Sequence, residues 1–192
     1  MKIKSQGWSD FLKEDWLKIL KPLISENSIF LEVGSFEGDS ACWFVENLKP
    51  KSLTCVDIFT SVIDYPDIGK QNVKDIFDLN TQEHKEITSI KGDSKDVLKL
   101  LRKEYFDFIY IDGSHKGSDV LCDAILADDL LKPGGYMLFD DYYWGDETRE
   151  DFRYNDPVNN PKYAIDSFKL LYSDRYSQIE KIKNWQILLR KN

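Results

Sequence analysis

Two kinds of apolar pattern alternate along the chain, and together they predict strands separated by helices. Short apolar runs, which indicate buried strands, lie at residues 29–33, 52–56, 87–90, 106–111 and 136–139. Apolar residues at helical spacing lie within residues 9–24, 39–48, 70–84, 95–103, 118–131 and 163–172. Two last apolar segments, 179–182 and 185–189, are joined by Lys183-Asn184 and predict an antiparallel hairpin. This order of segments predicts an α/β fold.

The connections between the segments predict a mostly parallel sheet. A helix joins the strand at 106–111 to the strand at 136–139, and such a right-handed crossover makes the two strands parallel neighbours. We expect seven strands, the last one antiparallel, with helices on both faces. No repeat or linker divides the chain, so residues 1–192 are expected to form one domain. Within it we expect a helical cover at residues 1–27 and a substrate-side loop at residues 145–161.

The composition indicates a globular protein that binds a small molecule. Of 192 residues, 42% are hydrophobic and 31% are charged, as in a domain with one sizeable core. The chain has 26 basic and 34 acidic residues, a net charge of −8, and no basic stripe. We therefore expect no nucleic-acid partner, because a phosphate backbone attracts basic surfaces.

Neither the cysteines nor the hydropathy indicate export or a membrane. Cys42, Cys55 and Cys122 lie far apart in apolar segments, which favours buried, reduced thiols over a disulfide or a zinc site. No apolar run approaches ~18 residues, the length expected of a membrane span, and no signal-peptide core opens the sequence. We expect a cytoplasmic protein; its oligomeric state is left open, with a homodimer as one option.

The strongest functional signal is the stretch IFLEVGSFEGDS at residues 29–40. An apolar strand leads through Gly34 and Gly38 to Asp39 and Ser40, either of which can cap a helix. This pattern predicts a strand, a tight glycine loop and the start of a helix. Ligands of open α/β sheets bind in the crevice at the carboxyl ends of such strands, so the loop is a candidate cofactor site.

The residues of this loop discriminate between cofactors. A dinucleotide fingerprint needs a glycine where this chain has Phe36, so that the backbone can approach a pyrophosphate. Acids around the loop would repel a phosphate and attract a cation; they are Glu32, Glu37 and Asp39. S-adenosylmethionine (SAM) fits this loop because it carries a sulfonium and an ammonium and no phosphate. The expected cofactor contacts in the loop are Glu32, Gly34, Ser35, Gly38 and Ser40.

Residues after the next two strands extend the candidate cofactor site. Asp57 ends the second strand about twenty residues beyond the glycine loop, where an acid can accept hydrogen bonds from ribose hydroxyls. Asp93 and Ser94 follow the third strand, and one of them is expected to cap the next helix.

Three acids are expected at the tips of two adjacent parallel strands. Asp112 follows the strand at 106–111, and Asp140 and Asp141 follow the strand at 136–139. Carboxylates held together cost free energy unless protons or a cation neutralise them, so the pattern predicts a divalent metal. Oxygen ligands suit Mg²⁺, with Mn²⁺ or Ca²⁺ as alternatives, and the lack of nearby cysteine or paired histidine argues against zinc. A solvated strand end is the competing interpretation.

His115 is the candidate general base, because it lies three residues after Asp112 and imidazole titrates near neutral pH. A histidine that orders the loop through hydrogen bonds is the competing interpretation. A bound dication would lower the pKa of an acceptor hydroxyl and orient its oxygen toward the SAM methyl carbon. The predicted catalytic residues are therefore His115 and Asp112.

These motifs carry a family resemblance. The segment Glu32-x-Gly34-x-x-x-Gly38-x-Ser40 resembles the nucleotide loop of class I SAM-dependent methyltransferases. The segments FIYIDGSH at 108–115 and LLKPGGYMLFDD at 130–141 resemble matching parts of that class. They are similar to the small metal-dependent O-methyltransferases that include the macrocin and related sugar O-methyltransferases, with catechol O-methyltransferase as a more distant relative. The resemblance is good over residues 29–144 and weaker beyond.

The resemblance implies a Rossmann-like methyltransferase fold and a set of site residues. The metal positions fall on Asp112, Asp140 and Asp141, the SAM positions include Glu32, Gly34, Asp57 and Asp112, and His115 falls at a possible base position. In the family an acid after the third strand reaches the adenine amino group, so Asp93 and Ser94 could divide capping and adenine contact between them. Compared with larger members of the family, we expect this chain to lack the extended N-terminal region with which they recognise substrate.

We therefore expect a methyltransferase that transfers the SAM methyl group to a hydroxyl of a small molecule, such as a sugar, a natural product or a catechol-like compound. A metal-independent enzyme that uses His115 and a non-catalytic SAM-binding module are the alternatives. Residues that could contact the acceptor are Tyr142, Tyr143 and Trp144, by stacking, and Arg149 or Arg153, by holding an acidic group. A mobile polar loop explains these five residues equally well.

Overall fold

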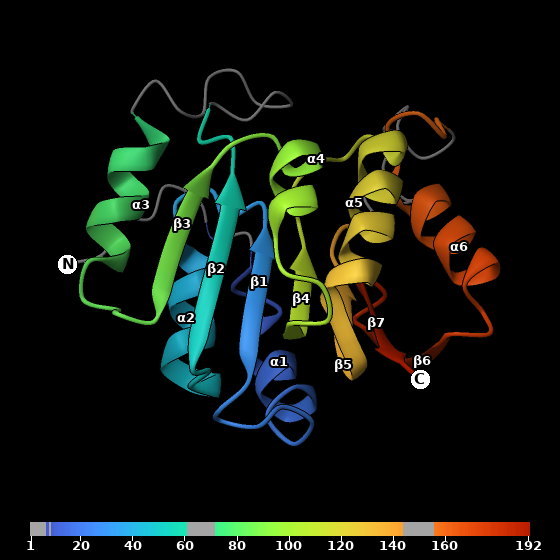
Figure 1. Cartoon of the computed structure of the whole chain (residues 1–192), viewed down its shortest axis with the longest axis horizontal. Helices are drawn as coiled ribbons and strands as arrows, with labels where there is room; N and C mark the ends of the chain where they lie inside the picture. The colour runs from blue at the N-terminus through green and yellow to red at the C-terminus, as the bar shows by residue number, and fades with distance from the viewer. Residues whose placement is uncertain (1–6, 8, 61–71, 144–155) are drawn as a thin grey trace.

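A seven-stranded sheet forms the centre of the protein (Figure 1). The computed structural model describes residues 7, 9–60, 72–143 and 156–192, and the structural statements below concern these residues. The strands are β1 (Ile29–Val33), β2 (Ser52–Asp57), β3 (Ile87–Lys91), β4 (Phe106–Ile111), β5 (Leu131–Phe139), β6 (Tyr176–Ile182) and β7 (Gln186–Lys191). They lie in the order β3-β2-β1-β4-β5-β7-β6.

The pairing of the strands confirms the predicted fold class. Strands β1 to β5 pair in parallel, and β7 is antiparallel to both β5 and β6. The sheet is therefore mostly parallel, and the last strand is the antiparallel one. The strand order reverses between β1 and β4, and in open α/β sheets such a switch point leaves a crevice at the carboxyl ends of the strands.

Helices cover both faces of the sheet. They are α1 (Lys13–Ile19), α2 (Asp39–Leu48), α3 (Val73–Thr81), α4 (Ser94–Val97), the 3₁₀ turn η1 (Leu98–Leu100), α5 (Gly117–Leu130) and α6 (Pro161–Leu171). Buried residues of η1, α5 and α6 belong to one core cluster, and those of α1, α2 and α3 belong to a second cluster on the opposite face. The sheet is the middle of three layers.

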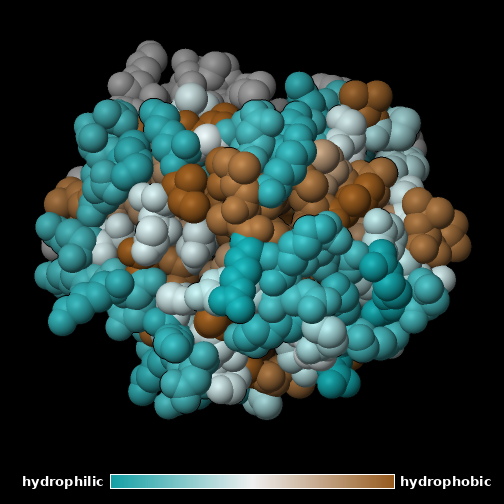
Figure 2. All heavy atoms as spheres, in the orientation of Figure 1, coloured by the Kyte–Doolittle hydropathy of each residue, from teal (hydrophilic) through white to brown (hydrophobic). Residues whose placement is uncertain are grey.

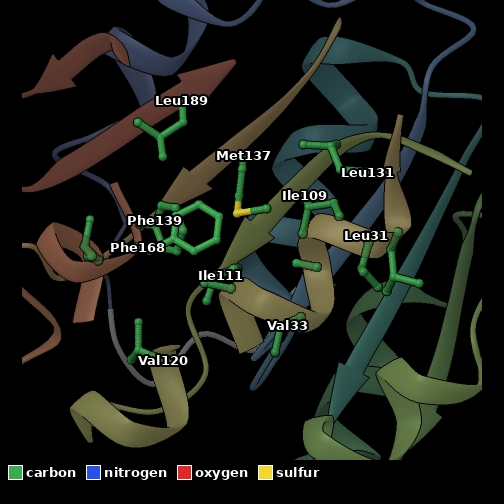
Figure 3. Packing of buried hydrophobic residues seen from close by; sticks show 14 of the residues in the cluster. Leu31, Val33, Ile109, Ile111, Val120, Leu131, Met137, Phe139, Phe168 and Leu189 are labelled. Carbon is green, nitrogen blue, oxygen red and sulfur yellow. The ribbon is translucent and has the colours of Figure 1, made fainter. Parts of the chain in front are cut away.

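Alternation along each strand builds the two cores. Side chains such as Ile109 and Ile111 of β4 lie with Met137 and Phe139 of β5 in the first cluster (Figure 3). The intervening Tyr110 belongs to the second cluster. Successive side chains of a strand point to opposite faces, so a strand that is apolar throughout is buried on both sides.

Several predicted elements have different bounds in the structure, and three of these differences have a local cause. The first helix is α1 alone rather than residues 9–24, because turns precede and follow it and Leu12 supplies no side-chain cap. The helix predicted at 95–103 consists of the short α4 followed by η1. The strand predicted at 136–139 begins at Leu131 in the structure, so residues 132–135 lie within β5, where the register against β4 shifts between the Phe106–Leu131 and Phe108–Tyr136 pairs. The sequence pattern missed this irregularity because a Pro-Gly-Gly run is typical of a turn.

The surface is largely hydrophilic, with apolar side chains gathered around α4 and α5 on the face shown in Figure 2. Cys42 and Cys55 are buried, Cys122 is partly buried, and all three are free thiols, as predicted. Among the described residues, no helix combines the length and the apolar character that crossing a membrane requires.

Candidate active site

The candidate site lies at the carboxyl edge of the parallel strands. The glycine loop follows β1, Asp57 ends β2, Asp112 follows β4, and Asp140 follows β5. Because these strands pair in parallel, their carboxyl ends lie along one edge of the sheet (Figure 1). The predicted site residues of these strands therefore share one edge.

The glycine loop packs directly against the tip of β4. Gly34 has φ +87°, and a Cβ atom at this position would lie 2.1 Å from the carbonyl oxygen of Asp112 and 2.4 Å from Cα of Gly113. The backbone N–H of Asp112 donates to the carbonyl of Val33 over 2.8 Å. Only glycine tolerates both this φ and this backbone contact. Gly34 thereby places the predicted cofactor loop beside Asp112.

Asp57 holds the glycine loop in place. Its Oδ2 accepts the backbone N–H groups of Ser35 and Phe36, each over 2.8 Å. Its Oδ1 accepts the N–H of Phe59 over 2.5 Å. Each carboxylate oxygen has two lone pairs, so these bonds leave capacity for a ribose hydroxyl. The predicted ribose contact stays a prediction, and the loop-ordering role is one that sequence reasoning missed.

The start of α2 differs from the prediction that Asp39 or Ser40 caps it. The N-cap residue is Gly38, with φ +81°, and it makes no side-chain cap. Asp39 instead accepts hydrogen bonds from Ser9 Oγ at 2.7 Å and Lys13 Nζ at 2.8 Å, which attach the segment around α1 to the loop. The predicted capping role was wrong because tertiary contacts engage both side chains.

Ser40 binds Glu32 rather than the helix end. Glu32 is completely buried, its Oε1 accepts the Ser40 hydroxyl over 2.6 Å, and its Oε2 accepts the Cys55 thiol over 3.4 Å. Burial is the main cause that raises the pKa of Glu32 to about 7. Glu37 is also buried, and Asp39 is paired with Lys13, so the acids around the loop present less negative charge to a ligand than the sequence analysis expected.

Asp93 caps the helix that follows β3, as the sequence allowed. Its Oδ1 accepts the backbone N–H of Lys95 over 2.9 Å, and Ser94 is the first residue of α4. The two residues therefore stand where the sequence placed them, next to the carboxyl end of β3. Their contact with adenine stays a prediction.

The structure brings Asp112, Asp140 and Asp141 together. Burial first, and then the charges of Asp140 and Asp141, raise the pKa of Asp112 well above its usual range. Burial and the charge of Asp141 raise the pKa of Asp140 to about 7. Asp140 and Asp141 thus lie close enough to Asp112 to disfavour its ionisation, and the sequence predicted that these acids lie together.

A buried polar network holds Asp140. Asp140 Oδ2 accepts the hydroxyl of Tyr110 and, over 2.8 Å, the side-chain amide of Gln186. Gln186 Oε1 in turn accepts the indole N–H of Trp16 over 2.6 Å. Trp16 and Gln186 have no exposed surface, and Tyr110 has 1%. Sequence reasoning missed all three residues, although a glutamine that opens an apolar strand is a signal that could have found Gln186.

The side chain of Asp141 pairs with His115. His115 Nε2 lies 2.9 Å from Asp141 Oδ2. The backbone of Asp141 has φ +56°, a left-handed conformation that costs about 1 kcal/mol or more for a residue other than glycine. The predicted general base, His115, therefore contacts one of the predicted metal ligands, Asp141.

The donor chemistry of the three acids fits a hard divalent cation, because carboxylate oxygens are its preferred ligands. In the part of the chain that the structure describes, no three Asp, Glu, His or Cys side chains converge on a metal position. Asp140 faces Tyr110 and Gln186, and Asp141 faces His115. The three acids lie near one another, but the carboxylates of Asp140 and Asp141 bind other side chains of the protein.

Comparison with known proteins agrees with this architecture. The seven-stranded sheet, its order and the loop after β1 define the class I methyltransferase fold. The chain belongs to the family described as "Methyltransferase domain", whose pattern matches residues 31–142, more than half of the chain. This match spans the glycine loop and all three acids at the tips of β4 and β5.

Individual relatives are distant. The chain is 28% identical over 131 residues to the uncharacterized protein R132 of Acanthamoeba polyphaga mimivirus, a match that spans 67% of this chain and 55% of that protein. The chain thus spans about half the length of this curated relative.

Two crystal structures share the fold. A candidate O-methyltransferase from Klebsiella pneumoniae has a TM-score of 0.67 at 17% identity, over 100% of this chain and 84% of that one. The O-methyltransferase from Bacillus cereus in complex with S-adenosylhomocysteine (SAH) has a TM-score of 0.59 at 21% identity, over 99% of this chain and 83% of that one. At these identities the similarity is one of fold.

Trp144, Arg149 and Arg153 lie outside the described residues, as does most of the loop predicted at 145–161.

We predict that Gly34→Ala lowers the free energy of unfolding by about 3 kcal/mol, since it combines left-handed strain with a backbone clash. Gly134→Ala is the matched control: φ is +80° there, but the nearest atom to an added Cβ lies 3.9 Å away. The control should lose about 1 kcal/mol, from strain alone. Urea unfolding measures both, and equal losses would contradict the contact between the loop and β4.

We predict that Glu32 makes stability depend on pH. Its folded pKa of about 7 exceeds the ordinary 4.5, so the folded state binds more protons between these values. The contribution of Glu32 is complete below the unfolded pKa and is lost as pH rises through the folded pKa. The free energy of unfolding of the wild type minus that of Glu32→Gln should fall by about 2 kcal/mol from pH 5 to pH 8 in urea titrations. A difference that stays flat would refute the buried, uncompensated carboxylate.

Proposed function

We propose that this protein transfers the methyl group of SAM to a hydroxyl of a small-molecule acceptor. The observation that carries the proposal is the His115–Asp141 pair, at 2.9 Å, on the same sheet edge as the glycine loop of a methyltransferase-family chain. The Bacillus cereus neighbour, an O-methyltransferase in complex with SAH, supports both the cofactor and the oxygen acceptor.

The cofactor would lie over the glycine loop, at the switch point between β1 and β4. The close packing of Gly34 on the Asp112–Gly113 backbone sets this loop beside the tip of β4. Asp57 would bind the ribose hydroxyls while it holds the loop amides, and Asp93 or Ser94 would contact the adenine. Asp112, which lies beside the loop, is the acid that would complement the positive charge of SAM.

His115 and Asp141 would remove the acceptor proton. Asp141 is acceptor-only when ionised, so His115 Nε2 carries the proton that it donates to Asp141. Nδ1 is then the basic nitrogen, and Asp141 stabilises the imidazolium that forms when Nδ1 takes the hydroxyl proton. The remaining task of the protein is to hold the hydroxyl oxygen in line with the methyl carbon.

Asp112, Asp140 and Asp141 are the residues that would hold a divalent cation, for which we propose Mg²⁺. The support is their mutual proximity, seen in the raised pKa values of Asp112 and Asp140, and their all-oxygen donor set. When bound, such a cation lowers the pKa of a coordinated hydroxyl. The alternative, a metal-independent reaction, is favoured by the direct pairing of Asp141 with His115.

We predict that His115→Gln lowers kcat by about 100-fold to 10,000-fold, as expected for loss of a general base. The dissociation constant for SAM should stay within about twofold, because the change leaves the glycine loop intact. Production of SAH measures the first quantity and calorimetry measures the second. The chain has two histidines, so His84→Gln, which alters a residue paired with Glu46, is the matched control. An unchanged kcat in His115→Gln would remove His115 from the mechanism.

We predict that EDTA lowers turnover by about 100-fold or more and that Mg²⁺ restores it, because a Lewis acid contributes several kcal/mol. SAM binding should persist in EDTA. Asp112→Asn should lose the response to Mg²⁺ and, in electron paramagnetic resonance titrations, the binding of Mn²⁺. Full turnover in EDTA would instead establish the metal-independent reaction of His115 and Asp141.

A further inference from the structure

Two tyrosines and three lysines form a cationic cluster directly after the acidic tip of β5. The ring centre of Tyr142 has the Nζ atoms of three lysines within 6 Å, at 5.1 Å for Lys162, 5.9 Å for Lys169 and 5.3 Å for Lys181. Lys181 Nζ also lies 4.4 Å from the ring centre of Tyr143. We call these five residues the Lys–Tyr cluster.

The Lys–Tyr cluster holds more positive charge than its carboxylate partner neutralises. Asp166 Oδ2 lies 2.5 Å from Lys162 Nζ, and Asp166 Oδ1 lies 3.8 Å from Lys169 Nζ. Lys181 donates to the neutral hydroxyl of Tyr143 over 3.1 Å. Within this group of residues, three positive charges therefore face one negative charge. Such an excess is unusual in a chain of net charge −8, and an anion would relieve the repulsion.

The ammonium groups of the cluster are held rather than extended into water. The side chains of Lys162 and Lys169 are 31% and 29% exposed, and each lies over an aromatic face. Tyr142 is buried, and its hydroxyl donates to Asp166 over 2.9 Å. A cation over the negative face of an aromatic ring gains a modest electrostatic stabilisation. These contacts therefore hold the ammonium groups at positions that the fold sets.

The cluster adjoins the proposed catalytic pair. Tyr142 directly follows Asp141, and consecutive Cα atoms lie about 3.8 Å apart. On the other side, the backbone N–H of Gly117, two residues after His115, donates to the carbonyl of Val158 just before α6. This contact ties the start of α6, and with it Lys162, to the loop that carries His115.

We propose that the Lys–Tyr cluster binds an anionic group, a carboxylate or a phosphate, of the methyl acceptor. The proposal rests on the proposed function, because it describes the acceptor of that reaction. The ammonium groups would supply charge-assisted hydrogen bonds, and the partly buried ring of Tyr143 would supply an apolar wall for the body of the acceptor. The acceptor would then be a hydroxyl compound that also carries a negatively charged group, although the protein has a net negative charge.

The test compares two catechols that differ in charge. The probes are 3,4-dihydroxybenzoate, which is anionic, and 3,4-dihydroxybenzyl alcohol, which is neutral. With SAM and Mg²⁺, the wild type should prefer the anion in kcat/KM by about tenfold, the scale of one hydrogen bond between charged groups. Lys181→Met should remove most of that preference by raising KM for the anionic probe.

Two control variants test whether the preference depends on a positive charge at position 181 or on the loss of any lysine. Lys181→Arg keeps the charge and should keep the preference, and Lys18→Met removes an exposed lysine of α1 and should behave as the wild type. Equal kcat/KM for the two probes in the wild type, or an equal loss in Lys181→Met and Lys18→Met, would overturn the anion site while leaving methyl transfer established.

A second measurement keeps the inference testable if neither catechol is methylated. That result would count against the proposed transfer to vicinal diols, and binding of inorganic phosphate to the SAH-loaded protein would then test the cluster alone. Calorimetry should show about tenfold weaker binding in Lys181→Met than in Lys18→Met. Equal affinities would overturn the inference.

Discussion

The close approach of the glycine loop to the tip of β4 is the contact on which the site depends. Gly34 and the Asp112–Gly113 backbone leave no room for a Cβ atom between them. This approach occurs where the strand order of the sheet reverses, and it sets Asp112 beside the loop. Asp57 then fixes the loop amides from the neighbouring strand. The cofactor loop is therefore shaped by three strands, and not by its own sequence alone.

Burial of acids is the second constraint, and it ties distant parts of the chain together. A buried carboxylate needs hydrogen-bond partners, and Asp140 obtains them from Tyr110 in β4 and Gln186 in β7. Gln186 in turn binds Trp16 of α1. The first helix and the last strand thus meet behind the tip of β5. The Lys–Tyr cluster, which we propose binds the acceptor, carries the opposite charge next to these acids in the chain.

Much of the fold could be predicted from the chain because its elements have strong local patterns. The bounds of α2 and β4 agree with the prediction, since apolar periodicity and the flanking breakers mark both ends. The grouping of Asp112, Asp140 and Asp141 followed from one crossover. The capping role of Asp39 could not be predicted correctly, because its partners Ser9 and Lys13 lie about thirty residues earlier in the chain. Gln186 and Trp16 are separated by 170 residues, and no local pattern links them.

The sequence by itself determined the class of fold, the strand tips that carry the chemistry and the kind of residue at each tip, because hydrophobic periodicity and turn residues act over short distances. Only the tertiary structure decided which way those side chains turn. It directed Asp141 to His115 and Asp140 to Gln186, buried Glu32, and gathered three lysines around Tyr142. The physical reason is that burial and charge pairing are set by residues that are close in space and remote in the chain.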